Sequence, residues 1–287
     1  MSRSQPVVIR SRGIGEPVPG PTLCAVTDRL PDSWTCLENP WLAQYGPAGE
    51  RLEGTVPFLD AVERGADDLV ALVRATTDTT DCADPADPGP PVILLGYSGG
   101  AVVVHRALER LDAADRDRVM AVGFVSDPEQ PRGTTGDPTR YGIRGESPVP
   151  DVPARWAAAP DDGICLCPDP SPLRLLAQWT PDLGGDSPLT WRDRASRALR
   201  LRRGAAYHVD VRDLTGERAR FAEARRLLTG YLGEEHTSYA TRREPGTDAT
   251  FVDNMADWLR RIHDGEIHDG RIHGRRTPAT SVRPRTV

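Results

Sequence analysis

Apolar residues follow two alternating patterns along the first half of the chain. Short, almost unbroken apolar runs predict buried strands at residues 6–10, 92–95 and 120–128, the last ending in a loop. Between them, residues 58–74 and 100–111 place apolar side chains at helical spacing. Strands that are apolar throughout and alternate with helices are typical of a mostly parallel sheet covered on both faces. The sequence therefore predicts the α/β fold class.

This alternation breaks at residues 168–203. The segment is rich in proline and arginine and carries two tryptophans among polar residues, so we interpret it as an inserted, partly helical linker or lid. Three further elements are expected after it: a late strand at 207–213 and helices at 217–232 and 250–263. One domain over residues 1–265 accommodates all of these elements.

The C-terminal residues 266–287 differ from the rest of the chain. A short repeat places His263, His268 and His273 at five-residue intervals. Repeated histidine suggests metal ligands, but a glycine in each unit opposes a stable helix. We therefore expect a low-complexity, disordered tail with no metal site.

Composition and charge argue against several classes of function. A net charge of −6 without a basic stripe argues against a nucleic-acid partner. No apolar run reaches the ~18–20 residues that a membrane span requires. Residues 1–13 lack the apolar core of a secretory signal, so we expect synthesis in the cytoplasm without a signal peptide. No pair of CxxC motifs supports a structural zinc site.

The stretch Gly-Tyr-Ser-Gly-Gly at residues 96–100 joins an apolar strand directly to an amphipathic helix. In this context G-x-S-x-G is typical of a nucleophile elbow, a strained turn that exposes the serine hydroxyl at the carboxyl edge of the sheet. The following helix directs its amides and the positive end of its dipole at the serine oxygen. Ser98 is therefore the candidate nucleophile; the alternative is an ordinary tight connection.

A serine nucleophile needs a base, which is usually histidine near neutral pH. His236 lies in a loop between two late helices, as the chain order serine, acid, histidine requires. His105 is too close to Ser98 along the same helix to reach back, and His208 alternates with valines in the expected late strand. The remaining histidines lie in or near the tail, so His236 is the candidate base.

The third member of such a triad is a carboxylate that orients the histidine. It should lie between Ser98 and His236 in the chain. The candidates are four aspartates: Asp161, Asp162, Asp169 and, as an outside candidate, Asp127.

Two backbone amides are candidates for the oxyanion hole. One belongs to Gly99, directly after the serine, and the other to Ile14, in the glycine loop that follows the first strand. The same loop could hold a phosphate, but it lacks the third glycine of the dinucleotide-binding pattern.

Taken together, these stretches resemble the cutinase-like serine esterases and, more narrowly, the lysin B endolysins of phages that infect mycolate-bearing actinobacteria. The resemblance implies an α/β-hydrolase fold and covers most of residues 6–262. It rests on these stretches: RGIGEP, GYSGGAVV, SDPEQPRG, YGIRGESPVP, PDDGIC and HTSYA.

The resemblance also selects among the aspartates. PDDGIC is similar to the family pattern PGD-x-x-C if Asp162 takes the position of the acid and Cys165 that of the cysteine. The long interval from Asp162 to His236 is similar to lysin B. Gly99 stands where cutinases often carry glutamine, so only the backbone contribution to the oxyanion hole carries over.

For function, the resemblance implies hydrolysis of the ester that links mycolic acids to arabinogalactan in the host cell envelope. The enzyme would be made in the host cytoplasm and would act on the outer envelope after lysis. The residues alone imply acyl transfer to water through Ser98, without a metal or organic cofactor. Two alternatives remain open: a carboxylesterase or lipase for soluble or short-chain esters, and a non-catalytic envelope-binding module. Neither paired catalytic carboxylates nor a zinc pattern supports a peptidoglycan-cleaving lysin.

Overall fold

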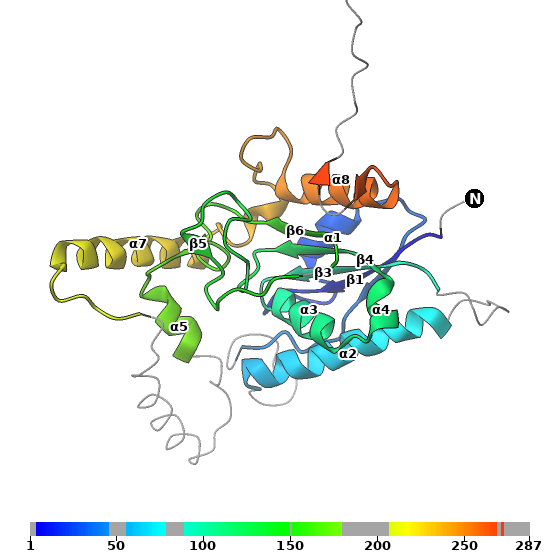
Figure 1. The fold of residues 1–287 in the computed structure, drawn as a ribbon, viewed down its shortest axis with the longest axis horizontal. Coiled ribbons are helices and arrows are strands. Elements are labelled where there is room, and N and C mark those ends of the chain that lie inside the picture. The colour runs from blue at the N-terminus through cyan, green and yellow to red at the C-terminus, as the bar shows by residue number, and fades with distance from the viewer. Residues whose placement is uncertain are drawn as a thin grey trace, which may run out of the picture.

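A five-stranded parallel sheet organises the chain, with the strand order β2-β1-β3-β4-β6 (Figure 1). All four strand pairings are parallel. The computed structural model describes residues 4–45, 56–78, 89–149, 151–179, 207–268 and 271–272. The strands of the sheet are β1 (Val7–Ser11), β2 (Thr35–Glu38), β3 (Val92–Tyr97), β4 (Val119–Val125) and β6 (Ala154–Ala157).

Side chains of the central strands alternate between two hydrophobic cores. In β3, Val92 and Leu94 belong to one core, and Ile93 and Leu95 belong to the other. Because successive side chains of a strand point to opposite faces, an unbroken apolar run fills both cores. The helices lie on the two faces of the sheet (Figure 1): α1 (Pro21–Thr27) and α8 (Phe251–His263) on one, α2 (Phe58–Asp78), α3 (Gly99–Arg110) and the short α4 (Ala113–Asp117) on the other. The predicted α/β class is confirmed.

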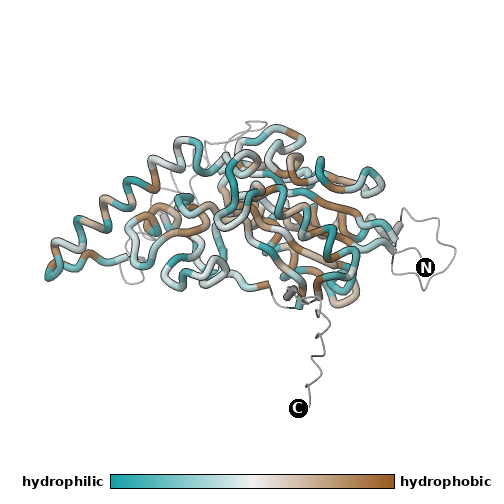
Figure 2. Tube along the Cα trace, turned by 90° about the horizontal axis from the view of Figure 1, so that it is seen from above, coloured by the Kyte–Doolittle hydropathy of each residue, from teal (hydrophilic) through white to brown (hydrophobic). Residues whose placement is uncertain are grey.

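Several further elements gather at one end of the sheet (Figure 1). They are the antiparallel pair β5 (Arg140–Tyr141) and β7 (Cys167–Pro168), and the helices α5 (Leu173–Trp179) and α7 (Leu214–Leu232). Seen from above, α7 extends away from the sheet and mixes polar and apolar residues, whereas the hydrophobic positions concentrate in the strands (Figure 2). The 3₁₀ helix η1 (Ser238–Ala240) leads on towards α8.

The predicted strand at 207–213 is wrong. Residues 207–210 have no regular structure and a turn follows them. Val209 and Val211 are 55% and 74% exposed, so their alternation marks no buried face. The backbone amide of Asp210 donates to the carboxylate of Glu217 in α7 rather than to a neighbouring strand. The segment is therefore an irregular connection that leads into the N-terminus of α7.

Two predicted segments lie partly outside the described residues. Of the predicted linker or lid at 168–203, the structure describes 168–179, which includes α5. Of the predicted tail, it describes the short hairpin of β8 (Ile267–His268) and β9 (Arg271–Ile272). Ile267 is buried in the core beneath α8; His273 lies outside the described residues.

None of the helices in the described ranges has the length and apolar character needed to span a membrane. Within the same ranges, no three His, Cys, Asp or Glu side chains gather in an arrangement suited to a metal ion.

Candidate active site

Ser98 occupies a strained turn between β3 and α3. Its φ of 52° and ψ of −121° are unusual for a residue with a side chain. The neighbouring glycines permit the turn: a Cβ on Gly96 would lie 2.6 Å from the Cα of Ala101, and one on Gly100 would lie 2.0 Å from the carbonyl oxygen of Ser11. The turn places Ser98 at the carboxyl edge of the sheet, where it is 7% exposed.

His236 reaches Ser98 from the loop after α7. Its Nε2 lies 2.9 Å from the Oγ of Ser98. Tyr97 fixes the histidine in two ways: the two rings stack with centroids 5.3 Å apart, and the Tyr97 hydroxyl donates to the His236 carbonyl at 2.7 Å. Tyr97 directly precedes Ser98, so two adjacent residues both contact His236. Tyr231 of α7 packs against the imidazole with centroids 4.8 Å apart.

Asp162 is fully buried on the other side of the imidazole. Its Oδ2 lies 2.9 Å from Nδ1 of His236 and accepts hydrogen bonds from the hydroxyls of Ser126 at 2.5 Å and Tyr239 at 2.8 Å. Its Oδ1 accepts from the Ile164 amide at 2.9 Å. Burial acts to raise the pKa of the Asp162 carboxyl, but the charge of His236 and these hydrogen bonds outweigh it. The pKa therefore lies below its ordinary value, which favours a carboxylate.

Two other candidate aspartates form ion pairs with arginines and do not hydrogen-bond to the histidine. Asp161 pairs with Arg226 at 2.7 Å and with Arg242 at 3.3 Å. Asp169 pairs with Arg132 at 2.8 Å. Both carboxylates are partly exposed and neither bonds to His236, so neither is placed to orient the imidazole.

Asp127 belongs to a second buried histidine–carboxylate pair. Its Oδ2 lies 2.8 Å from Nε2 of His105 and accepts from the Trp156 indole at 2.9 Å. The His105 ring stacks on Phe124 with centroids 4.4 Å apart. His105, a buried residue of α3, therefore packs in the core, and Asp127 is hydrogen-bonded to His105 rather than to His236.

The loop after β1 lies against the elbow. A Cβ on Gly99 would lie 2.7 Å from Cγ1 of Ile14, so these two residues are in close contact. Glu16 shapes the loop by accepting from the Gly13 amide at 2.8 Å, and the Gly15 amide donates to the Ala43 carbonyl at 3.1 Å. Across the described residues, neither the Gly99 amide nor the Ile14 amide donates to a protein acceptor. Both amides are thus available to a substrate oxygen.

An apolar cavity of about 250 Å³ adjoins the serine. Its walls come from the loop after β1, from α2 and from the elements at the carboxyl end of the sheet. Ser98 and Gly99 lie in the wall. The apolar side chains around them include Ile14, Phe58, Ile143, Ile164, Leu173, Leu176, Leu227 and Leu228. The arrangement suits an acyl chain whose carbonyl reaches Ser98.

Comparisons with known proteins agree with this architecture. Residues 57–172 match the Cutinase family model, a segment that contains Ser98 and Asp162 and ends before His236. The crystal structure of lysin B from Mycobacteriophage D29 matches with a TM-score of 0.51 and 18% identity, over 90% of this chain and 100% of that chain. The fold is that of the cutinase-like α/β hydrolases.

Two further solved structures are similar to the chain. A cutinase-like protein from Cryptococcus sp. shares 21% identity at a TM-score of 0.41, over 57% of this chain and 82% of that chain. The catalytic core domain of acetyl xylan esterase from Trichoderma reesei shares 18% identity at a TM-score of 0.48, over 62% and 93%. A comparison with curated protein sequences finds no match.

Two residues of the site, Ser126 and Tyr239, were not predicted from the sequence. Ser126 follows β4, is fully buried, and adopts a left-handed φ of 49°. Its Oγ also lies 3.0 Å from Nδ1 of His236. Tyr239, three residues after His236, accepts from the Ala159 amide at 3.1 Å while donating to Asp162. The available signal for Ser126 was a serine ending an apolar strand at the same sheet edge as Ser98.

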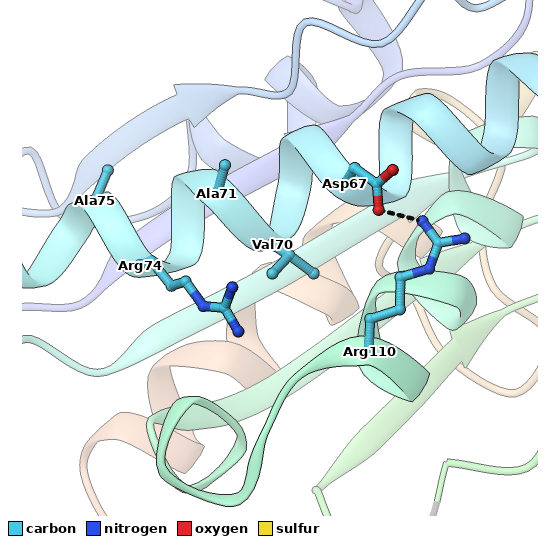
Figure 3. A pocket seen from close by; sticks show the side chains of 6 residues that line it. All are labelled: Asp67, Val70, Ala71, Arg74, Ala75 and Arg110. Atoms are coloured by element: carbon cyan, nitrogen blue, oxygen red, sulfur yellow. Dashed lines mark hydrogen bonds and ion pairs between the residues drawn. The ribbon is translucent and has the colours of Figure 1, made fainter.

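A separate surface depression lies between α2 and the far end of α3. It is lined by Asp67, Val70, Ala71, Arg74, Ala75 and Arg110 (Figure 3). Arg110 ends α3 whereas Ser98 precedes it, and a twelve-residue helix is about 18 Å long. Arg110 and Asp67 pair across the depression at 2.6 Å. This depression is therefore remote from the candidate active site of the cutinase-like fold.

Proposed function

We propose that the protein is a serine ester hydrolase that acts through Ser98, His236 and Asp162. The observation that carries this proposal is the unbroken hydrogen-bonded chain from the Ser98 hydroxyl through the imidazole to a buried carboxylate. The serine stands on a strained elbow beside an apolar cavity, as an acyl-transfer nucleophile requires.

In the proposed reaction, the Ser98 oxygen attacks the ester carbonyl while Nε2 of His236 takes the hydroxyl proton. The amides of Gly99 and Ile14 donate to the oxyanion of the tetrahedral intermediate. His236 then gives its proton to the leaving alcohol, which departs and leaves an acyl-serine. Water attacks this ester while the same histidine takes a proton from it, and His236 returns that proton to the Ser98 oxygen as the acid is released. Asp162 stays ionised and keeps Nδ1 protonated throughout.

For the substrate, we propose the ester between mycolic acids and arabinogalactan in the envelope of a phage host. The apolar cavity supports a lipid acyl group, and the likeness to a structure described as lysin B from a mycobacteriophage supports this class of ester. The proposal places synthesis in the host cytoplasm and action at the outer envelope after lysis.

The test is release of free mycolic acids from a purified mycolyl-arabinogalactan preparation. We expect release by the wild type and none above background by Ser98→Ala, because the nucleophile is gone. Ser33→Ala is the matched control. Ser33 is exposed and is not among the residues of the site, so this variant should release mycolic acids as the wild type does. If the wild type hydrolyses a soluble ester through Ser98 but releases no mycolic acid, the general carboxylesterase or lipase is the better assignment.

A fluorophosphonate probe separates an enzyme from a non-catalytic envelope-binding module. Such probes bond covalently to an activated serine. We expect labelling of the wild type and of Ser33→Ala, but not of Ser98→Ala. An unlabelled, correctly folded wild type would contradict the proposed chemistry and favour the binding module.

A further inference from the structure

Arg144 brings a positive charge into the wall of the cavity that contains Ser98. It is the charged residue among the described residues that line this otherwise apolar space. Its side chain is 14% exposed. A guanidinium removed from water is costly unless its five N–H donors find acceptors. The partners of this side chain therefore show whether it serves the fold or a ligand.

The backbone amide of Arg144 makes a hydrogen bond, whereas its guanidinium makes none with the described residues. The Arg144 amide donates to the Pro128 carbonyl at 2.8 Å. The guanidinium carbon lies 5.1 Å from the centre of the Phe58 ring, another wall of the cavity. Nε lies 3.5 Å from Oε1 of Glu129, and no hydrogen bond forms along this contact. No side-chain nitrogen of Arg144 makes a hydrogen bond in the part of the chain that the structure describes.

Glu129 does not neutralise the Arg144 charge by itself, because its carboxylate also accepts hydrogen bonds from other residues. It accepts from Arg106 at 3.1 Å and from the Ser147 hydroxyl at 2.7 Å. One carboxylate thus stands between two arginines, and the shorter contact belongs to Arg106. The donors of Arg144 are therefore not satisfied by hydrogen bonds to Glu129.

Arg174 shows how the same fold treats an arginine with a structural role. It is also buried, yet its guanidinium donates to the carbonyls of Gly142 and Cys167 at 2.7 Å each and to that of Pro168 at 3.2 Å. Those bonds tie α5 to β7 and to Gly142, the residue that follows β5. Among the described residues, Arg144 makes no comparable hydrogen bonds beside its 3.5 Å ion pair with Glu129, so a purely structural role does not account for its position.

We propose that Arg144 is a polar subsite of the acyl cavity and binds an oxygen atom carried by the acyl chain. The inference rests on the proposed ester hydrolysis and specifies its substrate class: acyl groups with a hydroxyl or carboxylate. Because Ser98 and Arg144 line the same small cavity, this oxygen lies only a few carbons from the ester carbonyl. A hydrogen bond from a guanidinium in apolar surroundings discriminates strongly against an acyl chain that lacks the oxygen.

The experiment compares three ethyl esters of equal carbon number in the acyl part: butanoate, 3-hydroxybutanoate and hemisuccinate. Acid release is followed by titration, and kcat/KM is measured for the wild type, Arg144→Met, Arg144→Lys and Arg74→Met. Arg74 lines the remote depression of Figure 3, so Arg74→Met controls for loss of an arginine as such. Thermal unfolding of each variant reports whether the fold is kept.

We expect the wild type and Arg74→Met to prefer an oxygen-bearing ester over butanoate by about tenfold or more, as one charge-assisted hydrogen bond provides. In Arg144→Met, kcat/KM should fall much more for the preferred oxygen-bearing ester than for butanoate, so that the preference is lost, and Arg144→Lys should keep part of it. Preference for 3-hydroxybutanoate identifies a hydroxyl as the ligand, and preference for hemisuccinate identifies a carboxylate.

Other outcomes overturn the subsite. Equal rates on all three esters in the wild type, or an equal loss on all three in a folded Arg144→Met, would refute it while leaving the esterase intact. Absence of wild-type activity on every ester, together with no labelling of Ser98, would instead refute the proposed function itself.

Discussion

The hydroxyl of Ser126 lies 2.5 Å from Oδ2 of Asp162 and, at the same time, 3.0 Å from Nδ1 of His236. It therefore contacts both partners of the hydrogen bond that orients the imidazole. Ser126 follows β4 and Ser98 follows β3, and these two strands are neighbours in the sheet. The two serines thus reach the histidine from adjacent strand ends, on opposite nitrogens of its ring.

Removing the Ser126 hydroxyl should slow the reaction without unfolding the protein. A hydrogen bond to a charged group contributes about 1.5–3 kcal/mol, so kcat should fall roughly 10- to 100-fold. Ser126→Gly is the cleaner variant, because glycine adopts the left-handed φ of 49° without strain. Ser126→Ala should lose as much activity and be no more stable than Ser126→Gly. Wild-type kcat in both variants would show that Ser126 does not position the pair.

Asp162 and Asp161 form a matched pair of neighbouring aspartates. Asp162→Asn should lower kcat by roughly four orders of magnitude, because an amide no longer holds the productive tautomer of His236. Asp161→Asn loses only partly exposed ion pairs with Arg226 and Arg242 and should retain nearly full activity. Steady-state kinetics on a soluble ester measure both. The opposite ranking of the two variants would reassign the triad acid.

The sheet and the elbow were predictable because strict physical constraints shape their sequences. A parallel strand buried on both faces must be apolar throughout, as Ile93, Leu94 and Leu95 are. The elbow requires glycine wherever a Cβ would meet backbone, as at Gly100. Both constraints are local, so they leave a pattern that can be recognised without knowing the rest of the fold.

Side-chain partners were less predictable because they depend on loops that meet far apart in the chain. Asp161 and Asp162 are equivalent candidates in the sequence, and only the resemblance distinguished them. In the structure Asp161 is partly exposed and Asp162 is fully buried. The alternation of Val209 and Val211 predicted a strand, but both side chains are exposed and no strand among the described residues pairs with this segment. A serine at a strand end is too common a feature to have indicated the role of Ser126.

The two glycines after Ser98 should respond differently to alanine. At Gly100 a Cβ would lie 2.0 Å from the Ser11 carbonyl oxygen, a backbone atom of β1 that cannot move aside, so Gly100→Ala should fail to fold. At Gly99 the nearest atoms belong to the Ile14 side chain, which can rotate away. Gly99→Ala should therefore fold with a stability loss of about 1–3 kcal/mol.

Activity of Gly99→Ala then reports on the oxyanion loop. Displacing Ile14 disturbs the second proposed donor, so kcat should fall by up to roughly 10²–10³-fold, the effect of losing one such donor. Chemical denaturation and ester kinetics measure the two quantities. A folded Gly99→Ala with unchanged kcat would contradict this coupling between the Ile14 side chain and the position of its amide.

The buried pair of His105 and Asp127 should make stability depend on pH. Burial acts against a charge on His105, but the attraction and hydrogen bond of Asp127, with the charge of Glu129, outweigh it and raise the histidine pKa above 6.5. Arg106 opposes them. A raised pKa means that the folded state holds the proton more tightly than the unfolded chain. The pair therefore stabilises the fold fully below about pH 6.5, and this contribution is lost as pH rises through the folded pKa.

His105→Gln tests this dependence, because an amide can still donate to Asp127 but does not titrate. Thermal unfolding measured from about pH 6 to about pH 9 should show a decline in wild-type Tm that begins above the unfolded histidine pKa. The variant should lack that part of the decline, although its Tm at the lower pH should be below that of the wild type, since a charged bond has become neutral. Parallel curves for the two proteins would mean that His105 carries the same charge in the folded and unfolded states.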